Sequence, residues 1–347
     1  MKNLHHKFSL LVSLLAAIAL FGCSPMIRSN APSNPVALPI ELSPTIEQIE
    51  ANGITIAYES YGSPADETIL LIAGTGMQLV DWPIELVEAL VQRGYRVVRF
   101  DNRDIGLSTK LTAAGLPDAE AIGKALEAGE PAPVPYTLQD MAADAIGLLD
   151  ALEIQQAHIV GISMGGAIAQ FIAIDYPERT LSLTVLAADS GNPDLPVIAD
   201  PEAFAGVPMP PTTVDQAAFI DWQVKTWQAL AGADYPTDEA ILLDWAKRDF
   251  ARGFEPAGLT RQQTVSLVGH FESASYRLNN LEKITAPTVV LQGEDDPLVP
   301  VASAEDIAAR VPGAELRLIP GLGHDIPAEL VTTFADAITA AAKRSTD

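Results

Sequence analysis

The chain has 347 residues, of which 48% are hydrophobic and 19% charged, a balance that excludes disorder over the whole length and can fill a sizeable core. The formal net charge of −24 at pH 7 argues against nucleic acid as a partner, because so acidic a chain repels phosphate backbones. Cys23 is the only cysteine, which excludes an intrachain disulfide and cysteine-based metal sites.

The first residues have the pattern of an export signal. A short basic start is followed by an apolar run from Phe8 to Phe21, shorter than the roughly 20 residues that a membrane-spanning helix needs. The run ends in Leu20-Phe21-Gly22-Cys23, which resembles the lipobox of bacterial lipoproteins, although Phe21 is bulkier than is usual there.

That resemblance implies a signal peptide over residues 1–22 and lipidation of Cys23. The protein would then be exported and held by its lipid on the bacterial membrane, facing the periplasm or the exterior. The alternatives are an ordinary secretory signal with an incidental cysteine, or an uncleaved anchor. Residues 23–44, rich in Ser, Pro, Asn and Ala, predict a flexible linker.

A regular pattern begins at Thr45. Residues 45–50 and 54–61, joined by Asn52-Gly53, predict a β-hairpin, because Asn-Gly supplies the positive φ angles of a tight turn. Residues 105–136, rich in Ala, Gly and Pro, are expected to be irregular. Short apolar strands and helices follow the hairpin in alternation, with strands at 68–73, 95–101, 158–162 and 180–187 and helices at 86–93, 137–152 and 164–176.

The amino-acid composition changes after Ser190, where Pro and Trp become frequent. We interpret residues 190–280 as a helical cap inserted between two strands of a core that comprises 45–189 and 281–347. The strand–helix alternation then returns, with strands at 287–292 and 314–319 and helices near 302–310 and 328–343. This alternation predicts an α/β fold, a mostly parallel sheet covered on both faces, with the hairpin adding antiparallel strands at one edge.

The strand at 158–162 runs into Gly161-Ile162-Ser163-Met164-Gly165, which matches the nucleophile-elbow pattern G-x-S-x-G. In that motif a sharp strand-to-helix turn exposes the serine above the carboxyl edge of the sheet, and the flanking glycines avoid collisions with backbone. The sequence therefore predicts Ser163 as a nucleophile.

A serine nucleophile needs a base and an acid that orients the base. In folds that carry this nucleophile elbow, the three residues follow one another along the chain in the order Ser, acid, His. His324 lies directly after the last predicted strand and is the candidate base. The preceding strand leads into Gly293-Glu294-Asp295-Asp296-Pro297, where Asp296 is the candidate acid and Asp295 the alternative. His270 lies in the predicted cap and is expected to be structural.

The oxyanion hole of such a site consists of two backbone N–H groups. Met164, directly after the candidate nucleophile, supplies one. Thr75, in the loop after the strand at 68–73, is the expected second donor, and Gly76 is the alternative.

These motifs together resemble the α/β-hydrolase fold family. Phe100-Asp101-Asn102-Arg103-Asp104 and Gly191-Asn192-Pro193-Asp194 are similar to its branch of anthracycline methyl-esterases, over about residues 45–340. The resemblance implies a cap-bearing, monomeric carboxylesterase with a Ser163–His324–Asp296 triad. Trp222, Trp227 and Trp245 are candidates for binding a small apolar or aromatic ester.

Three alternatives remain open from the sequence. A cofactor-free perhydrolase or haloperoxidase and a C–C bond hydrolase would use the same triad, and a non-catalytic binding protein could be built on the same scaffold. The sequence shows no metal cluster, phosphate-binding loop or dinucleotide motif, so we expect no cofactor, no metal and no partner besides a small-molecule substrate and the membrane of the lipid anchor.

Overall fold

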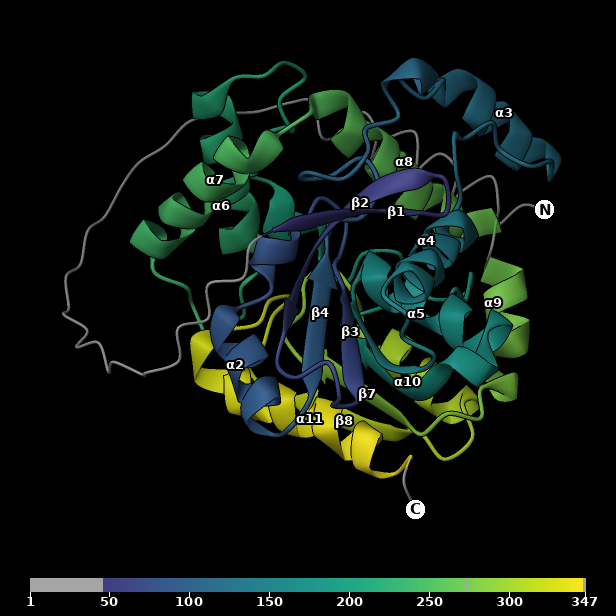
Figure 1. Cartoon of the computed structure of the whole chain (residues 1–347). Coiled ribbons are helices and arrows are strands. Elements are labelled where there is room, and N and C mark those ends of the chain that lie inside the picture. The colour runs from purple at the N-terminus through teal and green to yellow at the C-terminus, as the bar shows by residue number, and fades with distance from the viewer. Residues whose placement is uncertain (1–45, 273, 346–347) are drawn as a thin grey trace.

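One mixed sheet organises the chain. The computed structural model describes residues 46–272 and 274–345, and in this part eight strands lie side by side (Figure 1). The strands are β1 (Glu47–Ala51), β2 (Ile54–Tyr61), β3 (Thr68–Ile72), β4 (Arg96–Phe100), β5 (Ala157–Ile162), β6 (Thr180–Leu186), β7 (Thr288–Gly293) and β8 (Glu315–Ile319). Their order across the sheet is β1-β2-β4-β3-β5-β6-β7-β8.

The direction of the strands confirms the predicted α/β fold. β1 and β2 form the antiparallel hairpin at one edge, with Asn52 and Gly53 at φ 50° and 77° in its turn. β2 pairs antiparallel with β4, and the pairs from β4 to β8 are all parallel. β3 and β5 are buried along their whole length, as expected for parallel strands with both faces covered.

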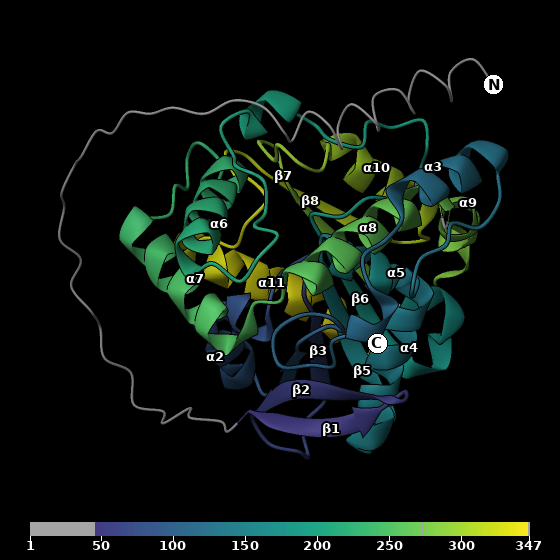
Figure 2. The same cartoon turned by 90° about the horizontal axis from the view of Figure 1, so that it is seen from above.

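Helices cover the two faces of the sheet as separate layers (Figures 1 and 2). Buried side chains of α2 (Ile84–Gln92) and α11 (Val331–Lys343) pack on one face. Those of α4 (Leu138–Ala151), α5 (Met164–Asp175) and α10 (Val301–Arg310) pack on the other. Successive residues of β3 alternate between these two apolar cores, because side chains of a strand point to opposite faces.

The expectation of an irregular segment over residues 105–136 is wrong in its middle, where α3 (Ala119–Ala128) forms. The Asp118 side chain accepts hydrogen bonds from the amides of Glu120 and Ala121 and caps the first turn, and Gly129 ends the helix at φ 69°. Only Ile122 of this helix is buried. Ile122, Ala125 and Leu126 nevertheless have helical spacing and pack in one small apolar cluster. The overall composition of residues 105–136 concealed this short periodic stretch, which the spacing and the Asp118 cap could have indicated.

Between β6 and β7 the chain leaves the sheet, and we refer to residues 190–280 as the cap segment. In the described residues it contains the helices α6 (Gln216–Leu230), α7 (Glu239–Gly253), α8 (Pro256–Glu272) and α9 (Ala274–Asn280). α6 and α7 pack as a pair to one side, and α8 runs beside them over the end of the sheet (Figure 2).

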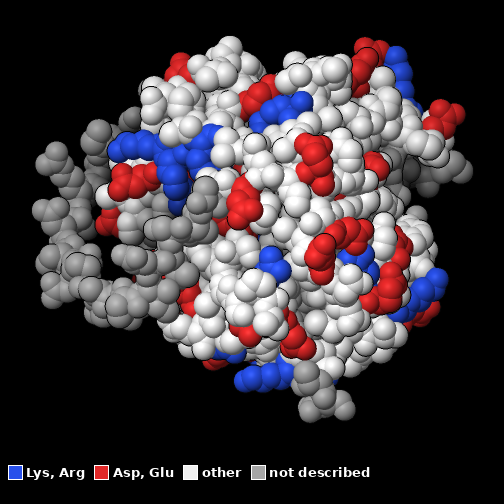
Figure 3. All heavy atoms as spheres, viewed as in Figure 1, with Lys and Arg blue, Asp and Glu red and all other residues white. Residues whose placement is uncertain are grey.

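On the face seen in Figure 3, acidic and basic groups are interspersed with large uncharged areas. No helix within residues 46–272 or 274–345 has the length and apolar character needed to cross a membrane. The predicted signal at 1–22, Cys23 and the linker at 23–44 lie outside the described residues.

Candidate active site

Ser163 occupies a strained turn between β5 and α5. Its φ is 57° and its amide donates to the carbonyl oxygen of Leu186 at 2.9 Å. A Cβ on Gly161 would lie 2.0 Å from the Gly165 carbonyl oxygen, and one on Gly165 would lie 2.1 Å from that of Ile72. Side chains at these two positions are therefore impossible, and the glycines allow the turn that places Ser163 at the N-terminus of α5, where the helix dipole favours negative charge.

Asp296 and His324 meet from two neighbouring strand ends. Asp296 lies in the loop after β7 and His324 in the loop after β8, and Nδ1 of the histidine lies 2.8 Å from Oδ2 of the aspartate. Oδ2 also accepts a hydrogen bond from Nε2 of Gln292 at 2.8 Å. Oδ1 accepts from the amides of Leu298 and Val299, each at 2.8 Å. The carboxylate is thus held in one orientation by four donors.

This environment keeps Asp296 ionised. Burial by itself would raise the pKa of the carboxyl, but the His324 imidazole and the hydrogen bonds from Val299 and Gln292 together hold it below its ordinary value. An ionised Asp296 accepts the Nδ1 proton of His324 and leaves Nε2 as an acceptor. Asp295, the alternative acid, is exposed.

The loop after β3 contains Thr75 and Gly76, the two candidates for the second oxyanion donor. Hydrogen bonds hold this loop from two sides. The Gly76 amide donates to Oε1 of Gln262 on α8 at 2.6 Å, so it is already occupied. On the other side, Nδ2 of Asn102 donates to the Ala73 carbonyl oxygen at 3.0 Å. Thr75 is then the remaining predicted donor of this loop, and it lines the same cavity as Met164 and Ser163.

That cavity has a volume of about 390 Å³, within the range typical of small-molecule sites. The cavity lies at the carboxyl end of β3, whose neighbours in the sheet are β4 on one side and β5 on the other. The order of the strands reverses at this point, and α/β sheets bind ligands at such topological switch points. Core and cap segment both contribute to its wall, and Ser163 and His324 lie in that wall together.

The three predicted binding tryptophans do not share one environment. Trp222 and Trp227 on α6 line the cavity. Trp245 on α7 does not: its ring packs edge-on against Trp227, with 6.2 Å between the ring centroids. The physical reason is that α7 turns this face toward α6, where Trp245 joins the apolar contact between the two helices.

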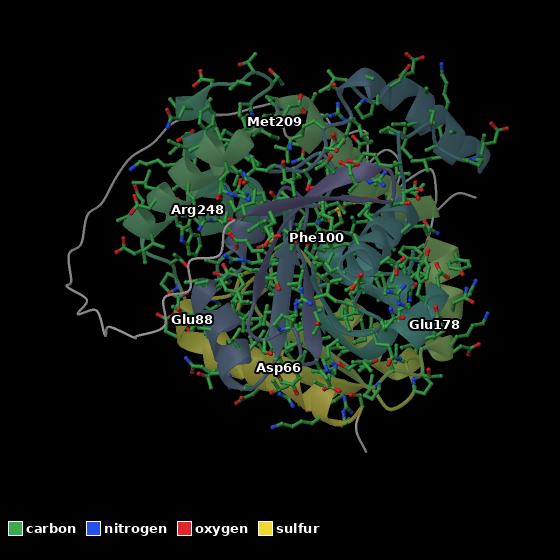
Figure 4. The ribbon with its side chains drawn as sticks, viewed as in Figure 1. Asp66, Glu88, Phe100, Glu178, Met209 and Arg248 are labelled. Carbon is green, nitrogen blue, oxygen red and sulfur yellow. The ribbon has the colours of Figure 1, made fainter. Side chains whose placement is uncertain are left out.

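Ion pairs connect the cap segment to the core around the cavity. Nη2 of Arg261 lies 2.7 Å from Oδ1 of Asp104, and both side chains are buried. Arg252 pairs with Asp101 at 3.1 Å. Arg248 of α7, where the cap segment meets the core (Figure 4), pairs with Asp81 at 2.6 Å.

Asp81 is itself one of two buried carboxyl groups bridged by this arginine. Arg248 lies 2.9 Å from Oδ1 of Asp249, and Asp81 and Asp249 both line the cavity. Burial and the neighbouring Asp249 raise the pKa of Asp81 well above its usual range, against the opposing effect of Arg248.

Sequence reasoning missed one polar cluster in the cavity wall. Asp189, His270 and Arg277 line the cavity together, although His270 was expected to be structural. Asp189 follows β6, while the other two lie on α8 and α9. No local pattern marks such a cluster, because only the folded chain brings its members together. In the part of the chain that the structure describes, no group of three or more His, Cys, Asp or Glu is arranged to hold a metal ion.

Comparisons with known proteins agree with the fold. Residues 67–329 match the family model described as alpha/beta hydrolase fold. The chain is 32% identical over 312 residues to rhodomycin D methylesterase DnrP of Streptomyces peucetius, covering 84% of this chain and 96% of the relative. It is 31% identical over 320 residues to rhodomycin D methylesterase DauP of Streptomyces sp. (strain C5), covering 86% and 98%.

Among solved structures, the chain is similar to Est816, described as an N-acyl homoserine lactone degrading enzyme. The TM-score is 0.61 with 26% identity, over 85% of this chain and 99% of the other.

Proposed function

The chain belongs to the α/β-hydrolase family, and on this premise we propose that it is a serine hydrolase that cleaves carboxylic esters through an acyl-enzyme. One observation carries the proposal. Ser163 stands at the strained turn before α5 in the same cavity as His324, whose Nδ1 is bound to the ionised Asp296. A nucleophile, a base and an orienting acid are the set that acyl transfer needs.

In the proposed reaction, Nε2 of His324 takes the proton from Ser163 as the hydroxyl oxygen attacks the ester carbonyl. The C–O bond to the alcohol then breaks, and the alcohol leaves with that proton. Water repeats the sequence on the acyl-enzyme, which releases the carboxylic acid and restores Ser163. Asp296 keeps the imidazole oriented and stabilises its charged form.

The negative charge of each tetrahedral intermediate needs donors that are already in place. We propose the amides of Met164 and Thr75 for this role. Met164 is the first residue of α5, so its N–H belongs to the group that has no acceptor within the helix. The loop of Thr75 is held by Asn102 and Gln262, which reduces the reorganisation needed as charge develops.

The cavity favours an ester with an apolar or aromatic part. Its wall is largely apolar and includes Phe219, Trp222, Trp227 and Phe254 from the cap segment. The similarity to two methylesterases supports an ester substrate with a small alcohol.

Substitution of the nucleophile tests the proposal. Ser163→Ala is expected to lower kcat for p-nitrophenyl esters by about 10⁴–10⁶-fold. A fluorophosphonate probe should label the unaltered protein and fail to label Ser163→Ala. Ser303→Ala, a buried serine on α10 outside the cavity wall, is the matched control and should be labelled normally. Retained hydrolysis by Ser163→Ala would refute the assignment.

The same assays separate the alternatives. A binding protein on this scaffold would neither turn over esters nor react with the probe. A perhydrolase or a C–C bond hydrolase would react with the probe but would turn over peroxide-dependent substrates or a vinylogous diketone faster than any ester.

We also propose that the protein is exported and anchored to the bacterial membrane through a lipid on Cys23. The pattern Leu20-Phe21-Gly22-Cys23 supports this localisation. Metabolic labelling with a fatty-acid analogue should mark the protein in a bacterial host, and Cys23→Ser should abolish the label. An unlabelled protein in the soluble fraction would contradict the anchor.

A further inference from the structure

A polar cluster outside the proposed triad shares the cavity with Ser163. Oδ1 of Asp189 accepts hydrogen bonds from Nη2 of Arg277 at 2.5 Å and from the Gly191 amide at 2.6 Å. The same oxygen lies 3.3 Å from Nδ1 of His270. Arg277 and His270 are therefore neighbours, because a nitrogen of each lies within 3.3 Å of one oxygen atom.

Two members of the cluster, Arg277 and His270, lie in the protein interior, while the Asp189 side chain is 29% exposed. Arg277 is fully buried, with its guanidinium carbon 5.7 Å from the centre of the Phe171 ring, and His270 is 8% exposed. Burial would raise the pKa of Asp189, but Arg277, His270 and the Gly191 amide together hold it well below its ordinary value. Asp189 is therefore ionised and can only accept hydrogen bonds.

The charge of Asp189 fixes the tautomer of a neutral His270. Since the carboxylate only accepts, Nδ1 carries the proton, and Nε2 presents a lone pair. This Nε2 is buried and has no hydrogen-bond partner among the residues that the structure describes. Nε and Nη1 of Arg277 are also buried without a partner within residues 46–272 and 274–345, and they can only donate.

Three buried nitrogen atoms on two adjacent side chains thus lack a hydrogen-bond partner among the described residues, which favours the binding of a ligand there. A buried polar group without a partner is destabilising, so such groups are rare unless something binds them. The pattern here is one acceptor beside several donors. A hydroxyl group matches both, because its proton can go to His270 while its oxygen accepts from Arg277. A ketone or an ether would satisfy the arginine only.

We infer that Asp189, His270 and Arg277 form a substrate subsite that binds a hydroxyl group, phenolic or alcoholic, on the acyl part of the ester. This inference rests on the proposed function, since it names the substrate class of the same cavity. His270 and Arg277 would contact the substrate, and Asp189 is a positioning residue that orients both.

Matched esters measure the subsite directly. The probes are methyl phenylacetate and its ortho-, meta- and para-hydroxy derivatives. At least one hydroxylated ester should exceed the parent in kcat/KM by about ten-fold, mainly through a lower KM, because one added hydrogen bond is worth about that factor. His270→Phe removes the acceptor, and Arg277→Lys keeps a cation beside Asp189 but removes the planar donors. Each variant should reduce the preference toward unity.

Tyr276→Phe is the matched control on α9. Its hydroxyl donates to Asp175 and the residue is 45% exposed, so the preference for the hydroxylated ester should survive. Thermal unfolding of each variant identifies any that fails to fold. The inference is wrong if the unaltered protein shows no preference, or if the preference survives in both folded variants. It is also wrong if a carboxylate-substituted ester is preferred, because the subsite would then bind an anion.

A binding measurement separates this result from a failure of the proposed function. Ser163→Ala protein is titrated with the same esters by calorimetry, which needs no turnover. Tighter binding of a hydroxylated ester, lost in the Ser163→Ala/His270→Phe protein, supports the subsite even if no ester is hydrolysed. Equal binding of all four esters overturns the subsite while leaving the hydrolase assignment intact.

Discussion

Gln262 of the cap segment accepts a hydrogen bond from the Gly76 amide of the core at 2.6 Å, across 186 residues of sequence. The side chain is fully buried, and its Nε2 donates to the Arg103 carbonyl oxygen at 3.3 Å. Gln262 thus connects the loop of Thr75 to a helix outside the sheet. The cap segment takes part in positioning the proposed oxyanion hole as well as in covering the cavity.

Replacement of Gln262 tests this positioning role. Gln262→Leu should free the Gly76 amide and loosen the loop, which we expect to lower kcat by about ten- to a hundred-fold, less than the loss of an oxyanion donor itself. KM should change by much less, because Gln262 does not line the cavity. Thr264→Ala, on the same helix, is the control and should leave both constants unchanged. Equal changes in kcat and KM would indicate general disruption of the cap segment.

The two adjacent aspartates after β7 should differ sharply in their effect on activity. Asp296→Asn replaces the acceptor of the His324 Nδ1 proton and favours the wrong tautomer, so kcat should fall by about 10⁴-fold. Asp295→Asn changes an exposed side chain and should leave kcat within about two-fold. Ester hydrolysis by the two purified variants measures this directly. A larger loss in Asp295→Asn would reassign the acid.

The sequence predicts those features whose signals are local. Alternating strands and helices indicate the sheet, and Asn52-Gly53 indicates the hairpin turn, because these patterns depend on neighbouring residues. The positions of Ser163, Asp296 and His324 follow from strand order, since parallel strands end at one edge. Their roles stay a proposal.

The polar contacts of the cavity could not be predicted in the same way. Gln262 and Gly76, or Asp189 and Arg277, are far apart in the chain and have no motif in common. Their pairing depends on how α8 and α9 pack on the core, which no periodicity encodes. Trp245 shows the same limit: its type indicates burial, but only helix packing decides whether it faces a ligand or a neighbouring helix.

Asp325 should make folding stability depend on pH. It follows His324, is 8% exposed, and its Oδ1 has no hydrogen-bond partner within the described chain. Burial raises its pKa to about 7, with smaller contributions from Asp296 and Glu329, although His324 opposes the shift. The folded protein therefore holds this proton at pH values where the unfolded chain has released it.

The sign of the effect follows from that difference. Because the folded state binds more protons, stability contributed by neutral Asp325 is present at low pH and is lost as the pH rises toward 7, by up to about 4 kcal/mol. Asp325→Asn should remove this loss. Urea unfolding between pH 4 and pH 8 measures it, and Asp336→Asn, an exposed partner of Arg93, is the control that should keep the pH dependence of the unaltered protein. Parallel curves for Asp325→Asn and the unaltered protein would contradict the prediction.

Arg248 should stabilise the contact of the cap segment with the core by neutralising Asp81 and Asp249. Removing it as Arg248→Met leaves two buried carboxyl groups facing each other without a cation. Breaking a buried pair typically destabilises by about 3–5 kcal/mol. The Arg248 side chain is 35% exposed, and solvent screening reduces the expected loss to about 1–2 kcal/mol. The loss should grow as the pH rises, because the raised pKa of Asp81 means that its ionisation is unfavourable in the folded state.

A double-mutant cycle with Asp81→Asn separates this charge effect from lost packing. Once Asp81 carries no charge, removal of Arg248 leaves one buried carboxylate instead of two, so the combined loss should fall short of the sum of the single losses by about 1 kcal/mol. Urea unfolding of the four proteins gives the coupling, and protease cleavage within the cap segment shows whether it acts at this contact. Additive losses would mean that Arg248 stabilises the cap segment through its aliphatic stem, and then the loss in Arg248→Met should not vary with pH.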